Sequence, residues 1–160
     1  MKFTVFIILS LGIMACQIPK NTITSPIGVV SLNNYKLIDA VKLTEEISYK
    51  YFTKAEDFQR FFSMTKSTRE TAIVPDFNTQ SVVAIVMQPT MKIITLQIEK
   101  AAIGGDELSI YFSRIDTTTT FTAAYAQPVT TLAIVPKNEG IKTVSFYNSN
   151  LKVYALKIPD

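Results

Sequence analysis

Carboxylates are the residues of this chain that offer the widest range of chemistry. The sequence contains thirteen of them and no histidine, so histidine-assisted nucleophiles and zinc sites built from histidine and cysteine are excluded. Glu45-Glu46 and Asp106-Glu107 are adjacent pairs, but neighbours in a strand or turn point to opposite sides, whereas a glycosidase needs both carboxyls on one substrate. No spaced Asp/Asn run predicts a calcium site, and no glycine-rich phosphate loop precedes a helix. We therefore expect a protein that is not an enzyme and that uses no metal or cofactor.

Cys16 is the only cysteine, and its surroundings indicate a site of lipid attachment. Lys2 precedes an apolar segment from Phe3 to Ile13, an order typical of a secretory signal. This run is shorter than the ~20 residues that span a bilayer as a helix. Ile13-Met14-Ala15-Cys16 resembles the lipobox of bacterial lipoproteins, which implies cleavage before Cys16 and acylation of its thiol. A buried free thiol or an ordinary cleavage site is the alternative.

These features predict three parts: a signal peptide at residues 1–15, an acylated cysteine and tether at 16–26, and a single domain at 27–160. The polar stretch from Gln17 to Pro26 suits an extended tether. Several acyl chains would hold it stably, because each buried CH₂ contributes roughly 0.8 kcal/mol. Gln17 stands where many lipoproteins retained at the inner membrane have aspartate. By that analogy we expect the outer membrane, facing the periplasm, with the cell surface as the alternative.

An apolar run from Ser81 to Met87 predicts the central strand of the domain. Its β-branched residues and the absence of charge are typical of a strand buried on both faces. Other patterns predict a hairpin around Gly104-Gly105-Asp106-Glu107 and a strand at 143–148 that returns beside 128–136. Further strands are expected at 27–32, 46–52, 93–99, 108–113 and 151–158, while 35–43 fits either a helix or a strand. The fold class is mainly β: an antiparallel β-sandwich or partly closed barrel with one covering helix near residues 54–62.

The covering helix has a recognisable start. Thr53-Lys-Ala-Glu56 matches a capping box, in which Thr53 and Glu56 satisfy early backbone N–H groups. Ala55, Phe58, Phe61 and Phe62 then fall on one helical face. We expect that face to pack on the sheet.

Two polar connections are candidates for contact with a partner, although either can equally be an uninvolved connection. The first comprises Gln88, Pro89, Thr90, Met91 and Lys92. The second runs from Asp116 and presents Thr117, Thr118, Thr119, Thr120 and Phe121. Asp116-Thr117-Thr118 also resembles an O-glycosylation sequon, with a bare loop as the alternative.

Residues 46–148 resemble the carboxyl-terminal domain of the PrcB-like protease-complex lipoproteins. The resemblance rests on Tyr49-Lys-Tyr-Phe-Thr-Lys-Ala-Glu-Asp-Phe58, Pro75-Asp-Phe77, Val82-Val-Ala-Ile85, Gly104-Gly105, Leu132-Ala-Ile-Val-Pro-Lys137 and Val144-Ser-Phe146. It implies an all-β domain on a secreted or lipid-anchored protein that associates with a cell-envelope protease. The chain is also similar to the chagasin-type protease inhibitors, which insert loops into an active site. One departure concerns 88–93, where the family has glycines after the proline and this chain has Thr90, Met91 and Lys92.

The expected function is that of a non-catalytic, lipid-anchored envelope protein. It would act as a protein-binding module, either stabilising or inhibiting a secreted or envelope protease. The alternative is a structural or small apolar-ligand-binding envelope lipoprotein. Nucleic acid is not an expected partner, because 16 basic and 13 acidic residues form no arginine-rich stripe.

Overall fold

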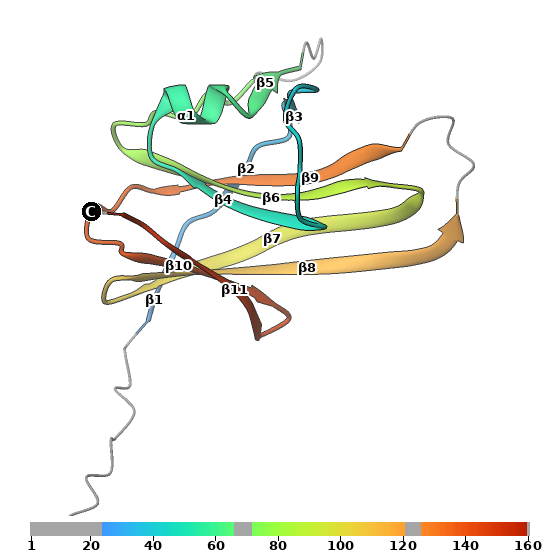
Figure 1. Ribbon diagram of the computed structural model, residues 1–160. Helices are drawn as coiled ribbons and strands as arrows, with labels where there is room; N and C mark the ends of the chain where they lie inside the picture. The colour runs from blue at the N-terminus through green and yellow to red at the C-terminus, as the bar shows by residue number, and fades with distance from the viewer. Residues whose placement is uncertain (1–23, 66–71, 121–125, 160) are drawn as a thin grey trace, which may run out of the picture.

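A computed structural model describes residues 24–65, 72–120 and 126–159, and it shows two facing sheets with a small third layer (Figure 1). The first sheet has the order β1 (Ser25–Ile27), β7 (Lys92–Gly104), β8 (Glu107–Thr120), β10 (Thr143–Asn148), β11 (Leu151–Lys157). The second has the order β2 (Val30–Ser31), β9 (Gln127–Pro136), β6 (Gln80–Thr90), β4 (Ile47–Phe52). The third layer contains β3 (Tyr35–Leu37) paired with β5 (Phe62–Met64), and α1 (Ala55–Gln59). The predicted β-sandwich is confirmed, and the sheets do not form a closed barrel.

Strand β6 is the centre of the second sheet, as its apolar run predicts. It lies between β9 and β4, and its residues from Val82 to Met87 are at most 2% exposed. Side chains alternate across a strand, so Val83 and Ile85 face the space between the sheets while Val82 and Ala84 face the third layer. One strand therefore contributes to two hydrophobic clusters.

The first sheet packs against β6 through apolar side chains that the alternating sequence pattern of 93–99 and 108–113 predicted for one face of each strand. Ile94 and Leu96 of β7, with Ile110 and Phe112 of β8, are buried in the cluster between the sheets. The predicted hairpin is confirmed, because Gly104 pairs with Glu107 and Gly105 has a φ of 63°, a conformation that glycine adopts without strain.

The third layer corrects the predicted helix. Lys54, not Thr53, is the N-cap, and no side chain caps the helix, so the capping box is absent. The helix ends at Gln59, and Phe62 lies in β5, where it pairs with Leu37. Packing explains the early end: Phe62 stacks on Phe58 with 5.3 Å between ring centroids, and this tertiary burial outweighs a weak local helical preference.

Two connections differ from the expected all-antiparallel arrangement. Strand β10 does not return beside β9: it lies in the opposite sheet and pairs in parallel with β8. Ile141 is buried at 5% exposure in the crossing between them. The predicted strand at 27–32 is instead two strands, β1 and β2, which pair with different sheets. Ser25 and Pro26, expected in the tether, belong to β1.

Candidate functional site

The two stretches predicted to contact a partner lie at the same end of the sandwich, at the right of Figure 1. Lys92 pairs with Thr120, and Ile93 pairs with Thr117, because β7 and β8 form one long antiparallel ladder. We call the segments Gln88–Lys92 and Thr117–Thr120 together the hairpin end, because β6 turns into β7 there; the glycine hairpin between β7 and β8 lies at the opposite end of β7. Pairing of β7 with β8 thus brings together candidates that are about thirty residues apart in the sequence.

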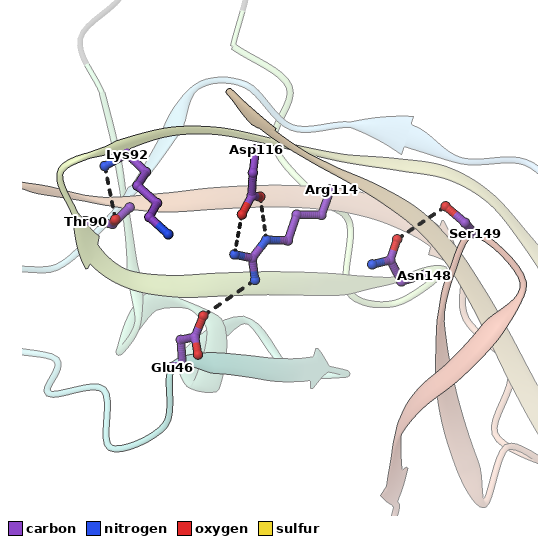
Figure 2. A network of polar contacts seen from close by, with 7 residues as sticks. All are labelled: Glu46, Thr90, Lys92, Arg114, Asp116, Asn148 and Ser149. Carbon is purple, nitrogen blue, oxygen red and sulfur yellow. Dashed lines mark hydrogen bonds and ion pairs between the residues drawn. The ribbon is translucent and has the colours of Figure 1, made fainter. Parts of the chain in front are cut away.

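These stretches are strands and not the loops that their polar composition suggested. Gln88, Pro89 and Thr90 complete β6, Lys92 begins β7, and Thr117–Thr120 complete β8. Met91 alone separates β6 from β7 and is 52% exposed. Lys92 N donates a hydrogen bond to Thr90 Oγ1 over 3.1 Å, which supports this tight turn (Figure 2). Phe121 lies outside the described residues.

Polar contacts at the hairpin end centre on Arg114 (Figure 2). Its Nε and Nη2 atoms donate to the two carboxylate oxygens of Asp116 over 2.6 and 2.8 Å. Its Nη1 atom lies 3.5 Å from Glu46 Oε1, on the segment that leads into β4. The hydrogen bond from Arg114 lowers the pKa of the Asp116 carboxyl. Arg114 therefore links the two sheets electrostatically, and the sequence analysis did not single it out.

An apolar cavity of about 300 Å³ opens beside β6 at this end. Its lining residues are Leu37, Ile38, Asp39, Val41, Leu43, Gln88, Pro89 and Pro128. Gln88 holds the outer wall in place, because its Nε2 atom donates to Leu43 O over 3.0 Å and its backbone N donates to Glu46 O over 2.9 Å. Of the predicted residues, Gln88 and Pro89 belong to this cavity.

The rest of the cavity wall was missed. Leu37, Ile38 and Val41 belong to the segment that fitted either a helix or a strand. Their apolar character was visible in the sequence, but their position opposite β6 depends on the turn that places β3 over the sheet. A second hollow, of about 430 Å³, adjoins the cavity and shares Leu37, Asp39 and Pro128 with it.

The adjacent residues Asp106 and Glu107 make structural contacts in the turn of the β7–β8 hairpin. Glu107 lies 3.1 Å from Lys152 Nζ, while the backbone oxygen of its neighbour Asp106 accepts from Lys142 N over 2.8 Å. The pKa of the Glu107 carboxyl is lowered by the Ser145 hydroxyl, which is buried without a hydrogen bond of good geometry, and by the Lys152 ammonium, which does make a hydrogen bond to it. Across residues 24–65, 72–120 and 126–159, no three His, Cys, Asp or Glu residues gather as a metal-ligand set.

Cys16 and the expected signal peptide lie outside the described residues. Within the part of the chain that the structure describes, no helix is long and apolar enough to cross a membrane. No protein-family model, curated protein or solved structure matches the chain.

Proposed function

We propose that this chain is a lipid-anchored, non-catalytic protein-binding module of the bacterial envelope. Its partner would be a secreted or envelope protease, or a complex that contains one. Acylation of Cys16 would anchor it in a membrane, and the analogy at Gln17 favours the outer membrane, facing the periplasm, over the cell surface. The lipobox and the resemblance to the PrcB-like lipoproteins support this proposal.

The observation that carries the proposal is the convergence of both predicted stretches at the hairpin end. Large apolar side chains are exposed at or beside it: Met91 is 52% exposed, and Ile115, two residues before Thr117 and opposite Thr95 in the ladder, is 61% exposed. The charged residues Lys92, the first of β7, and Arg114, on β8, lie next to them in the sequence. Apolar anchors with polar residues around them are typical of protein interfaces.

The experiment is capture of the tagged, lipidated protein from gently solubilised envelopes, followed by mass spectrometry of what co-purifies. Because the candidate stretches are strands, point variants are preferable to loop replacement. Met91→Glu should reduce recovery of the partner at least tenfold. Val30→Glu is the matched control, since Val30 is 48% exposed on β2 and β2 pairs near the other end of β9. Cys16→Ser tests whether recovery needs the lipid.

Stoichiometric recovery of one protease or one envelope complex, lost in Met91→Glu and kept in Val30→Glu, would support the proposal. Equal recovery with both variants would refute the hairpin end as the contact surface. Absence of any stoichiometric protein partner would refute the protein-binding function itself.

A second candidate function is binding of a small apolar ligand. Val83, Ile85 and Phe146, in the cluster between the sheets, are fully buried and so offer no surface to a ligand from solvent. The cavity of about 300 Å³ beside Gln88 has the apolar lining and the minimum size of a ligand pocket. Organic extraction and mass spectrometry of the purified protein test this, because a carrier retains its ligand and Val41→Trp should expel it.

A further inference from the structure

Two tyrosine rings lie together on the outer face of the first sheet. Tyr111 belongs to β8 and Tyr147 to β10. The residues next to them, Phe112 and Phe146, are buried between the sheets. Because successive side chains of a strand point to opposite faces, both tyrosines point away from that cluster. They are only partly buried, so small molecules in solvent can reach their rings.

The pairing of β8 with β10 holds the two rings face to face. Tyr111 is the register partner of Tyr147, and the two strands run parallel. The ring centroids are 4.9 Å apart, and the ring planes differ by 20°. Side chains of parallel strands lean in the same direction along the strand. This arrangement favours a stack in which the phenol ends lie side by side.

A lysine side chain lies against each ring of this stack. Lys100 of β7 pairs with Tyr111, and its Nζ atom lies 4.7 Å from the centre of that ring. Lys152 of β11 pairs with Tyr147, and its Nζ atom lies 5.9 Å from the centre of that ring. The four strands β7, β8, β10 and β11 are neighbours in the sheet, so each contributes one residue to a continuous row. Cation–π attraction at both ends of the row restricts movement of the rings.

We propose that Tyr111 and Tyr147 form a site of oxidative modification, at which a one-electron oxidant joins the two rings as dityrosine. Each phenol loses one electron and one proton to become a phenoxyl radical. The two radicals couple through a ring carbon beside each oxygen, and the hydrogen on each of these carbons then moves to the oxygen, which restores both phenols. Two electrons and two protons leave in total, and the electrons reduce two equivalents of the oxidant.

A second stacked pair among the described residues shows why position matters. Tyr49 and Tyr154 have ring centroids 4.8 Å apart and ring planes that differ by 15°. Tyr49 also packs on Phe146, with 4.7 Å between centroids, against the cluster between the sheets, and burial raises the pKa of its phenol. Its phenol therefore loses a proton less readily, and its neighbours leave less room for the rings to turn edge to edge, as the new bond requires. We expect oxidation to link the outer pair and not this one.

The new bond would tie the two sheets together. Between Tyr111 and Tyr147 the chain passes through β9, which belongs to the second sheet, and returns to the first sheet at β10. A cross-link that closes a long loop lowers the conformational entropy of the unfolded chain. The linked protein should therefore melt roughly 10 °C higher than the unlinked one, as expected for a loop of this length in a chain of this size.

The test uses photochemical oxidation by a ruthenium trisbipyridine complex with persulfate, which acts as a small one-electron oxidant. The oxidant is applied to the full chain carrying Cys16→Ser, so that no thiol consumes it. We expect the blue fluorescence of dityrosine and, after proteolysis and mass spectrometry, a linked pair of peptides that contain Tyr111 and Tyr147. The yield should not change on dilution, because both rings belong to the same chain.

Conservative variants separate the outer pair from the inner pair. Tyr111→Phe and Tyr147→Phe keep the stacked rings but lack a phenol oxygen. Each should abolish both the fluorescence and the rise in melting temperature. Tyr49→Phe and Tyr154→Phe are the matched controls and should change neither.

Three results would overturn the modification site: no dityrosine after oxidation, dityrosine that still forms in Tyr111→Phe, or a yield that rises with protein concentration, which would place the bond between two chains. A linked protein with an unchanged melting temperature would refute the tie between the sheets. The site goes beyond the protein-binding function and does not depend on it.

Discussion

Arg114 shows how a single side chain can join the two sheets at the hairpin end. Its planar guanidinium matches the two oxygens of Asp116, an arrangement that lysine cannot reproduce. A third contact reaches Glu46, which precedes β4 of the opposite sheet. The Arg114 side chain is 23% exposed, so solvent screens these contacts less than those of a fully exposed pair.

We expect Arg114→Leu to lower the free energy of unfolding by about 1 kcal/mol, because two carboxylates lose their partner. Urea unfolding measures this. Arg60→Leu is the control: Arg60 lies 3.8 Å from Asp57, its side chain is 74% exposed, and its loss should change stability by less than about 0.5 kcal/mol. Equal effects would contradict the linking role of Arg114.

Glu107 should make stability depend on pH. Its pKa is lowered in the folded chain by Ser145 and Lys152, so its contribution is present above the unfolded pKa of about 4.3 and is lost as pH falls through the folded value. Glu107→Gln should therefore lower the melting temperature at pH 7 and flatten its decline in acid. Glu139→Gln, in the exposed turn after β9, should do neither. Parallel curves for Glu107→Gln and the unmodified chain would contradict this.

At the scale of elements, the third layer is the least regular part of the structure. Its helix has five residues and an N-cap, Lys54, whose side chain makes no capping hydrogen bond. The backbone of Lys54 is extended, as an N-cap requires. The layer depends on packing of Phe58 and Phe62 more than on local helix stability.

Lys54→Asp should stabilise the chain by about 1 kcal/mol, because aspartate accepts a hydrogen bond from the free N–H groups of α1 and complements the helix dipole. Chemical denaturation measures the gain. Gln59→Asp, at the opposite end of α1, should give no gain. Stabilisation by both variants would point to net charge and not to capping.

At the scale of the whole molecule, β6 divides the interior into two clusters of different character. The cluster between the sheets includes Phe146 and is bounded by hydrogen-bonded strands on both sides. The cluster under the third layer includes Phe58, and β3 and β5 pair with no strand of either large sheet among the described residues. The third layer is therefore held to the sandwich mainly by side chains.

Hydrogen exchange should separate these clusters. Phe58→Ala should speed amide exchange in α1, β3 and β5 while β6 remains protected, because a lost aromatic side chain costs about 3–5 kcal/mol where it packs. Phe146→Ala should instead speed exchange in both large sheets. Uniform acceleration by Phe58→Ala would show that the third layer unfolds only with the sandwich.

Some of the strands, one hairpin and part of the hydrophobic core could be predicted from local patterns in the sequence. The alternation in 93–99 and 108–113, the glycines at 104–105 and the apolar run of β6 identified strands, a hairpin and a core. These signals are local because burial of one face imposes a period of two on each strand. Gln88 and Pro89 were recognised as candidate residues, although for a loop and not for the wall of a cavity.

The sequence by itself determined the central strand β6, the β7–β8 hairpin and the alternation that gives these strands an apolar face. Only the tertiary structure decided which strands are neighbours: β10 beside β8, β1 and β2 on different sheets, and Gln88–Lys92 next to Thr117–Thr120. Alternation reports a face but not a partner, since pairing depends on contacts between residues far apart in the chain.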